Sequence, residues 1–238
     1  MARRALVTGS ARGIGRAIAL ALAERGLDVA VHYRRSLEDA EATARAVEAR
    51  GRRAVLVRGD VTDPEEAAAI VAEAARGLGG LEVLVHNVGD YLYKDLEAVT
   101  AEEWRAILAS NLDSAFYLTQ AALPHLRRAG GGARVVYLGY AGAGQIVAKP
   151  AIAPYFVAKT GVVLLAKAYA RRFAGEGITF NVVAPGVAEN SVTKPLGEIP
   201  MGRVAALEEV ARAVLFFVDE DAGYLTGQVL EVAGGWNL

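Results

Sequence analysis

A tyrosine and a lysine four residues apart could carry proton-transfer chemistry in this chain. Tyr155 and Lys159 belong to the stretch PYFVAKTGVVLLAKAYARRF, and residues i and i+4 are neighbours on one face of a helix. A nearby ammonium favours the ionised form of a phenol, whose pKa is about 10 in isolation. A phenol tuned in this way can act as a general acid or base. Taken alone, the pair favours a packed tyrosine and a solvated lysine, because this spacing is common on helices.

A glycine-rich segment near the start of the chain could bind phosphate. TGSARGIG, residues 8–15, lies between the first strand pattern and the first helical pattern. Gly9, Gly13 and Gly15 would let the backbone approach a pyrophosphate, whose charge the helix N-terminus favours. The spacing is GxxxGxG rather than GxGxxG, so the prediction depends on the strand before it and the helix after it. An ordinary tight turn is the weaker alternative.

The end of the second strand pattern indicates which dinucleotide would bind. An acidic residue about 20 positions after the glycines would hold a ribose 2′-hydroxyl, whereas arginine accommodates a 2′-phosphate. The chain has HYRRS at residues 32–36 and no acid until Glu38. Arg34 and Arg35, joined by Arg12 in the glycine loop, therefore favour NADPH. If these arginines are only solvated, the missing acid still disfavours NADH.

Strand and helix patterns alternate from end to end. The predicted strands are residues 5–8, 29–33, 54–58, 83–87, 134–138, 179–183 and 229–232. Apolar residues recur with a 3.6-residue period over residues 14–25, 38–50, 64–78, 101–128, 155–173 and 207–218. This alternation predicts right-handed βαβ units and a doubly wound, mostly parallel sheet with helices on both faces. The apolar strands agree, because strands buried on both faces need not alternate.

Local signals support two of the helix starts. Asp63 stands before Pro64, as a capping side chain before a proline in the first turn. Thr100 precedes AEEW, and Glu103 is in position to complete a capping box. The sequence contains no linker, repeat or low-complexity tract, so residues 1–238 are predicted to form one domain.

Composition excludes several kinds of protein. The chain has 238 residues and no apolar run of about 18 residues, and MARRALVTGS does not resemble a secretory signal, so a cytoplasmic protein without a membrane span is expected. No cysteine is present, and His32, His86 and His125 lack metal-ligand spacing, so no metal is predicted. A net charge of −1 without a long basic run gives no nucleic-acid footprint.

Several segments together resemble the short-chain dehydrogenases/reductases from about residue 3 to 236. They are TGSARGIG, GDVTD (59–63), HNVG (86–89), SNLDSAF (110–116), Tyr155 with Lys159, NVVAPG (181–186) and GQVLEVAGG (227–235). The nearest resemblance is to 3-oxoacyl-acyl-carrier-protein reductases and, through HYRRS, to pteridine reductases. It implies a Rossmann fold with a seven-stranded parallel sheet and homotetramers that pack through residues 101–128 and the helix bearing Tyr155.

The resemblance also implies roles for particular residues. Tyr155 would exchange the proton with the substrate oxygen, and Lys159 would hold the nicotinamide ribose and lower the tyrosine pKa. Asn111 matches the family asparagine that supports a water relay to the lysine. For Asn111 and Asn87 the structural alternative is capping, which asparagine often provides.

The implied cofactor contacts extend over the whole carboxyl edge of the sheet. Asp60 and Val61 would meet the adenine, Asn87 and Gly89 the adenosine ribose, and residues 185–187 the nicotinamide. The cofactor-binding set is Gly9, Ser10, Arg12, Gly13, Ile14, Gly15, Arg34, Arg35, Asp60, Val61, Asn87, Gly89, Tyr155, Lys159, Pro185, Gly186 and Val187.

The chain departs from the family pattern at the catalytic serine. Family members carry a serine thirteen residues before the tyrosine, yet nothing between Thr119 and Thr160 is serine or threonine. Following the strand, Tyr140 falls where the serine is expected, whereas direct counting places Gly142 there. The Tyr140 hydroxyl could replace the serine hydroxyl, or its ring could only pack over the pocket, and neither is favoured. One donor aimed at developing charge is worth roughly 3 to 4 kcal/mol in rate.

Further departures concern the substrate lid and the C-terminus. Where the family has a threonine after the Pro-Gly pair, AENSVT offers Asn190, Ser191 and Thr193. The run from Pro185 to residues 201–203 is shorter than in typical acyl reductases, which disfavours a long acyl substrate. Ala233 stands where an aspartate is usual.

These observations lead to one first hypothesis and two alternatives. The first is an NADPH-dependent carbonyl reductase that transfers the pro-S hydride to a ketone, with Tyr155 as proton donor and Asn111, Tyr140 and Lys159 beside it. A pteridine reductase, which reduces a C=N bond, is the alternative among enzymes. A nucleotide-binding regulatory protein that has lost turnover is the alternative of another class, and the absent serine motivates it.

Overall fold

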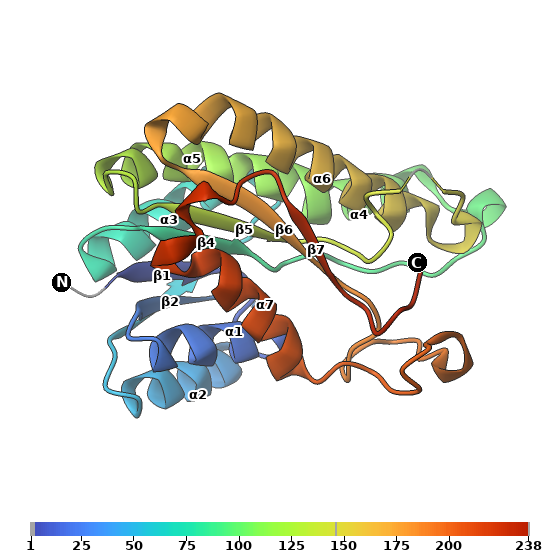
Figure 1. Ribbon diagram of the computed structural model, residues 1–238, viewed down its shortest axis with the longest axis horizontal. Helices are drawn as coiled ribbons and strands as arrows, with labels where there is room; N and C mark the ends of the chain where they lie inside the picture. Colours follow the sequence, from blue (N-terminus) through green and yellow to red (C-terminus); the bar gives the residue numbers. More distant parts are fainter. Residues whose placement is uncertain (1–2, 146, 238) are drawn as a thin grey trace.

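Seven parallel strands form one sheet in the computed structural model, which describes residues 3–145 and 147–237 (Figure 1). The order is β3-β2-β1-β4-β5-β6-β7. The strands are β1 (Arg4–Val7), β2 (Asp28–Tyr33), β3 (Ala54–Arg58), β4 (Val83–His86), β5 (Arg134–Leu138), β6 (Thr179–Pro185) and β7 (Val229–Val232). The helices are α1 (Gly13–Glu24), α2 (Leu37–Glu48), α3 (Pro64–Leu78), α4 (Ala101–Leu108), α5 (Ser114–Arg128), α6 (Ala153–Phe173) and α7 (Leu207–Val218). The predicted fold class is confirmed.

Two helical layers cover the sheet, because successive residues of each central strand face opposite sides. Leu6 of β1 packs in the hydrophobic cluster that includes α3, α5 and α6. Its neighbours Ala5 and Val7 pack in the cluster that includes α1, α2 and α7. Figure 1 shows these two groups of helices on opposite sides of the sheet, with α4 beside α6. The strands are therefore apolar on both faces, as their continuous apolar runs predict.

The sheet has a topological switch point between β1 and β4. These strands are neighbours in the sheet, yet the chain leaves β1 towards β2 and leaves β4 towards β5, on opposite sides. The loops after β1 and β4 therefore separate at the carboxyl edge. In doubly wound sheets this separation creates the crevice in which ligands bind.

The predicted helix over residues 101–128 is helical throughout, but its centre is not an α-helix. A π-helical turn, Ala109–Asp113, separates α4 from α5. Asn111 Nδ2 donates to Ile107 O at 3.0 Å, and Ser114 Oγ donates to Ser110 O at 2.7 Å. Side-chain hydrogen bonds to helix carbonyls compete with the backbone ladder, and π turns are frequent at functional sites. The apolar spacing continues through the turn and carries no sign of it.

Both predicted helix starts are confirmed by their capping contacts. The Asp63 carboxylate accepts from the backbone N–H of Glu65 and Glu66 at 2.8 and 2.9 Å. The Thr100 hydroxyl accepts from Glu103 N–H, and the Glu103 carboxylate accepts from Thr100 N–H. These contacts satisfy backbone donors that the first turn leaves free.

The longest helix, α6, carries Tyr155 and begins at Ala153, two residues before the predicted start. Among the described residues, Pro150–Glu176 alone is long and apolar enough by composition to cross a membrane. In this fold, however, Tyr169 and Phe173 of α6 pack against Phe180 of β6, with ring centroids 5.2 and 5.9 Å away. The apolar character of α6 therefore serves packing against the sheet.

Candidate active site

The glycine loop after β1 has a backbone that other residues adopt with strain. Gly9 and Gly13 have φ angles of +62° and +58°, in the left-handed region. A Cβ on Gly15 would overlap Gly9 O and lie 2.6 Å from Asn87 Nδ2. The loop leads directly into α1, whose first N–H groups favour an anion. The backbone present here therefore fits the pyrophosphate of a dinucleotide.

His32 holds the glycine loop against the neighbouring strands. Its Nδ1 accepts from Gly9 N–H at 2.9 Å, and its Nε2 lies 3.1 Å from Gly59 O. Because a carbonyl only accepts, this pattern assigns the proton to Nε2 of a neutral imidazole. Burial lowers the pKa of His32, which favours the same neutral form. These contacts could not be predicted from the sequence, because partners this distant leave no local signal.

Asn87 joins the ends of β1 and β4 beneath the loop. Its Nδ2 donates to Thr8 O at 2.9 Å and to Gly9 O at 3.2 Å. The Thr8 hydroxyl in turn accepts from the backbone N–H of Asn87 and Val88. Ser10 is also structural, because its buried hydroxyl donates to Val7 O at 2.7 Å. The Asn87 amide thus caps the end of β1, which is the structural role named as its alternative. Asn87 also lines the cavity that extends from the glycine loop to Tyr155.

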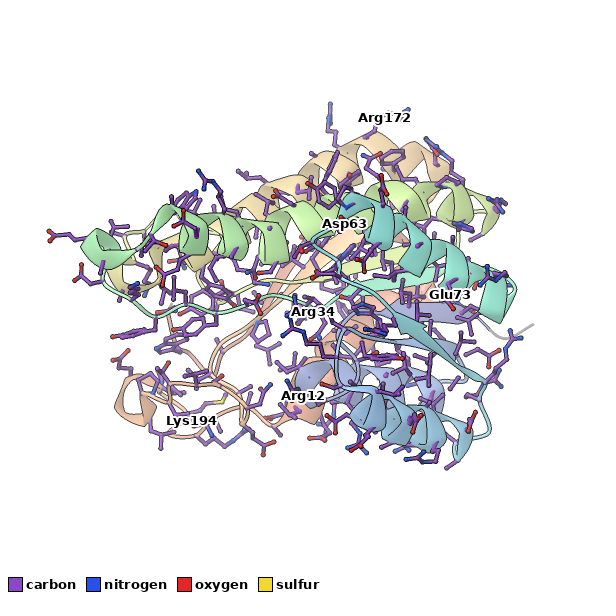
Figure 2. The ribbon with its side chains drawn as sticks, turned by 180° about the vertical axis from the view of Figure 1, so that it is seen from behind. Arg12, Arg34, Asp63, Glu73, Arg172 and Lys194 are labelled. Atoms are coloured by element: carbon purple, nitrogen blue, oxygen red, sulfur yellow. The ribbon has the colours of Figure 1, made fainter. Side chains whose placement is uncertain are left out.

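An arginine-lined cavity of about 320 Å³ lies between the glycine loop and the ends of β2 and β3. Its lining includes Arg12, Arg34, Arg35, Asp60 and Val61. Figure 2 shows the labelled side chains of Arg12 and Arg34 in the same region, away from the lid residue Lys194. Arg34 Nη1 lies 3.2 Å from Asp60 Oδ2, with the two side chains 48% and 32% exposed. An ion pair this exposed contributes only about 0–1 kcal/mol, so Arg34 can exchange partners.

The main cavity, of about 680 Å³, continues from the glycine loop to Tyr155. It gathers residues that are far apart in the sequence but share the carboxyl edge of the sheet. Predicted residues that line it are Gly9, Arg12, Gly13, Ile14, Asn87, Gly89, Tyr140, Tyr155, Lys159, Pro185, Gly186 and Val187, and the lid candidates Asn190, Ser191 and Thr193 line it too. Gly15, Ser10 and Asn111 do not line it, although Gly15 lies against Gly9 and Asn111 donates to Asp90 O.

Lys159 is buried against the end of β5. Its Nζ donates to Leu138 O at 2.7 Å and lies 5.6 Å from the centroid of the Tyr155 ring. Burial lowers the pKa of Lys159 to about 8, because the low-dielectric interior disfavours its charged form. Lys159 therefore changes charge close to neutral pH.

The pKa of Tyr155 differs from the expectation. Burial, and then the neighbouring phenols of Tyr140 and Tyr91, raise the pKa of Tyr155 rather than lowering it. Lys159 does not offset this effect, because its ammonium is directed to Leu138 O. In this structure Tyr155 is a protonated phenol at neutral pH, as a proton donor must be.

Asn111 lies behind the main cavity, next to Lys159. Its Nδ2 donates to Asp90 O and Ile107 O at 2.9 and 3.0 Å, while its buried Oδ1 has no partner. A Cβ on Gly89 would overlap this oxygen and lie 3.2 Å from Lys159 Nζ. Close approach of Asn111 and Lys159 to the loop after β4 thus requires a glycine at position 89.

A small cavity of about 10 Å³ adjoins Asn111 and Lys159, with His86 and Tyr137 also in its lining. His86 Nε2 lies 3.0 Å from Thr119 Oγ1, which lies 2.8 Å from the Tyr137 hydroxyl. His86 Nδ1 is buried without a partner, like Asn111 Oδ1. A cavity of this size with polar partners is large enough for about one water, which is the kind of space a water relay to Lys159 requires.

Known proteins resemble the chain over nearly its whole length. A family model described as enoyl-(acyl carrier protein) reductase matches residues 9–237. The 3-oxoacyl-acyl-carrier-protein reductase FabG of Staphylococcus aureus is 37% identical, and the match covers 99% of this chain and 98% of that protein. The chain belongs to the short-chain dehydrogenase/reductase family.

Solved structures agree with this membership. A putative short-chain alcohol dehydrogenase from Sinorhizobium meliloti is 35% identical with a TM-score of 0.92, covering 99% of this chain and 97% of that one. An acetoin dehydrogenase from Enterobacter cloacae is 33% identical with a TM-score of 0.92, covering 99% and 96%. As a short-chain dehydrogenase/reductase, this protein is an oxidoreductase whose relatives use NAD(P).

Tyr140, which falls where the family serine is expected along the strand, lies beside Tyr155. Its ring packs edge to face on Tyr155 and Trp236, with centroids 5.4 and 5.6 Å away. Burial raises the pKa of Tyr140 to about 12, although a hydrogen bond with the Asn237 side chain partly offsets this. Gly142, the position given by direct counting, is a turn residue with φ +85°. Tyr140 thus packs over the cavity and also carries a polar hydroxyl, so both of its predicted roles stay open.

The sequence patterns did not indicate two aromatic residues that line the cavity near Tyr155. Tyr91 follows β4, and its ring centroid is 5.0 Å from that of Tyr155. Trp236 lies after β7 near the C-terminus and lines the same cavity. HNVG ends two residues before Tyr91, so a scan of that loop for aromatic residues could have found it. Trp236 gave no signal, because only the completed fold brings the C-terminus to Tyr140.

Proposed function

We propose that this protein is an NADPH-dependent carbonyl reductase in which Tyr155 donates the proton. The observation that carries the proposal is the continuous main cavity from the glycine loop to Tyr155 and Lys159. NADPH, when bound, would supply a hydride to the carbonyl carbon. Residues 185–187 would flank the nicotinamide, and Gly9, Gly13 and Ile14 would cradle the pyrophosphate.

The proton chemistry belongs to the protein's own side chains. The substrate oxygen would accept a hydrogen bond from the Tyr155 hydroxyl and take its proton as negative charge develops there. Lys159 would turn from Leu138 O to the ribose hydroxyls and stabilise the resulting phenolate. Asn111, with one unpartnered oxygen towards Lys159, would orient the water that returns the proton. Tyr140 would supply a hydroxyl in place of the family serine.

NADPH is favoured over NADH by the arginine-lined cavity. Arg12, Arg34 and Arg35 converge there, and Arg34 is held only by an exposed ion pair. A charge-assisted hydrogen bond is worth roughly 1.5–3 kcal/mol, so Arg35→Ala should raise the Kd for NADPH about 10-fold or more. The Kd for NADH should change less than threefold. Equal effects on the two nucleotides would contradict NADPH preference, and Arg45→Ala on the exposed face of α2 is the matched control.

A small ketone is the proposed substrate class. The FabG relative is named for reduction of a 3-oxoacyl group, and the acetoin dehydrogenase for a small hydroxyketone. The test is NADPH oxidation with acetoacetyl thioesters, quinones and diketones, using wild type, Tyr140→Phe and Tyr155→Phe. Binding of NADPH without oxidation by any ketone would refute the proposal. Loss of rate in Tyr140→Phe would assign the role of the missing serine to its hydroxyl.

Pteridine reduction is the second candidate. The arginine pair after β2 and the absence of the serine favour it, because a C=N substrate presents no carbonyl oxygen to a serine. Turnover of dihydrobiopterin with NADPH, in the absence of ketone turnover, would select this candidate.

A nucleotide-binding regulator without turnover is the candidate of another class. Tyr140 at the serine position favours it, whereas the complete set of Tyr155, Lys159 and Asn111 opposes it. In this case Tyr155→Phe would leave function in the cell unchanged, and loss of that function would exclude a regulator.

We also propose that residues 1–238 act as one cytoplasmic domain that assembles into tetramers through α5 and α6. Phe116, Val157 and Leu164 are apolar but 44%, 47% and 64% exposed on these helices. Leu164→Glu should shift the molecular mass measured by light scattering from tetramer to a smaller species. A monomer in the wild type would refute the assembly.

A further inference from the structure

The substrate end of the main cavity is built from aromatic rings contributed by four separate segments. Tyr91 follows β4, Tyr140 follows β5, Tyr155 lies on α6 and Trp236 follows β7. The Tyr91 and Tyr140 rings both meet Tyr155 edge to face, at 80° and 82°. Trp236 meets Tyr140 at 87°. We name these four residues the aromatic enclosure, and all four line the cavity.

Polar contacts behind the rings fix the aromatic enclosure in place. Trp236 Nε1 donates to Glu198 Oε2 at 3.3 Å, which joins the C-terminal segment to the lid. Asn237 Nδ2 donates to Ala141 O at 3.2 Å, and Lys149 Nζ donates to Asn237 Oδ1 at 2.9 Å. The residues that follow Tyr140 and Trp236 are thereby tied to each other. Rings held in this way need little ordering when a ligand binds.

The aromatic enclosure has no free charge within the described residues that line the cavity. Arg12, Asp90 and Lys159 are the charged lining residues. Arg12 and Asp90 also line the arginine-lined cavity, so they belong to the nucleotide end. Lys159 donates to Leu138 O. Lys149 Nζ lies 6.0 Å from the centroid of the Trp236 ring, but Lys149 is outside the cavity lining and donates to Asn237 Oδ1. Among the described lining residues, no cation is therefore free beside Tyr91, Tyr140 and Trp236 to pair with a carboxylate or phosphate on a substrate.

We propose that the substrates are neutral ketones in which a planar aromatic ring adjoins the carbonyl group. This inference rests on the proposed carbonyl reductase function and specifies its substrate class. Aromatic pairs in edge-to-face or offset geometry are worth about 0.5–1.5 kcal/mol beyond area burial. A planar ring can make such contacts with Tyr91 and Trp236 while the carbonyl oxygen meets Tyr155. A flexible acyl chain gains none of them and loses rotational freedom.

A matched pair of ketones separates planarity from size and polarity. Acetophenone and cyclohexyl methyl ketone carry the same carbonyl and the same number of carbons, but only the first has a planar ring. Their dissociation constants can be measured by quenching of Trp236 fluorescence in a Trp104→Phe background, with and without NADP⁺. This readout does not require hydride transfer. We expect acetophenone to bind about 10-fold more tightly than cyclohexyl methyl ketone.

Two variants test whether the rings cause the preference. Tyr91→Leu should bring the two dissociation constants to within about twofold. Tyr93→Leu is the matched control, because Tyr93 is in the same loop, is 65% exposed and is outside the cavity lining. The control should retain the wild-type ratio.

The outcomes distinguish this inference from the function on which it rests. Equal affinity of the wild type for the two ketones would overturn the inference even if both are reduced. Preferential binding of acetophenone without NADPH oxidation by any ketone would uphold the aromatic enclosure and overturn the reductase. A preference that survives in Tyr91→Leu and is lost in Tyr93→Leu would also overturn the inference.

Discussion

Burial sets the charge of the two residues at the centre of the site. The same environment raises the pKa of Tyr155 and lowers that of Lys159 to about 8, since each shift favours a neutral group. The spacing of Tyr155 and Lys159 predicted their common helix face but not these shifts. Depth of burial depends on β5, whose last carbonyl accepts from Lys159, and on two phenols distant in sequence.

Lys159 makes nucleotide affinity depend on pH. We predict that the Kd for NADP⁺ is constant below about pH 7 and rises as the pH passes through 8. The reason is that Lys159 loses its proton near pH 8 and with it the attraction to the nucleotide. Calorimetric titration across this range gives the measurement. Lys159→Met should bind weakly with no such inflection, whereas Lys167→Met on the exposed face of α6 should behave as wild type. A flat wild-type profile would contradict this role.

His86 makes stability depend on acidity. Burial, and secondarily the charge of Lys159, lower the pKa of His86 to about 3, whereas an unfolded histidine titrates near 6.5. Below about pH 6.5 the unfolded chain binds the extra proton, so stability falls as pH falls, by up to roughly 1.4 kcal/mol per unit. Urea unfolding between pH 7 and 5 should show this slope, and His86→Gln should reduce it. An identical slope in the variant would show that His86 is not responsible.

Side-chain contacts to backbone groups determine where the elements begin and break. The strands and most helix ends followed from apolar patterns and capping residues such as Asp63 and Thr100. The π turn around Asn111 did not, because it depends on amide and hydroxyl contacts to Ile107 O and Ser110 O. It is this turn that presents Asn111 to Lys159. The π turn was therefore the part of this helix that periodicity could not predict.

The Asp63 cap of α3 should contribute to the free energy of unfolding. Asp63→Ala removes two hydrogen bonds to first-turn N–H groups and should lower the free energy of unfolding by about 1 kcal/mol. Glu73→Ala on the same helix is the control, because its ion pair with Arg76 is exposed and should contribute less than about 0.5 kcal/mol. Figure 2 shows the two positions on α3. Equal losses in urea unfolding would contradict the cap.

The whole molecule brings distant residues to one edge of the sheet. Alternating elements predicted the parallel sheet, and with the family resemblance they predicted the residues along the main cavity. The position of Trp236 against Tyr140 could not be predicted, since it requires the C-terminus to return across the lid. The position of His32 beneath the glycine loop could not be predicted either, because its partners Gly9 and Gly59 are distant in the sequence. The aromatic enclosure of the main cavity is therefore visible only in the fold and not in the sequence motifs.

NADPH oxidation by wild type and Tyr155→Phe, measured with diketones and acetophenone, tests the central claim most directly. The account predicts turnover by the wild type and a loss of about 100-fold or more in Tyr155→Phe, with NADPH affinity unchanged within about threefold. Oxidation at the same rate in Tyr155→Phe, or none in a wild type that binds NADPH, would contradict it.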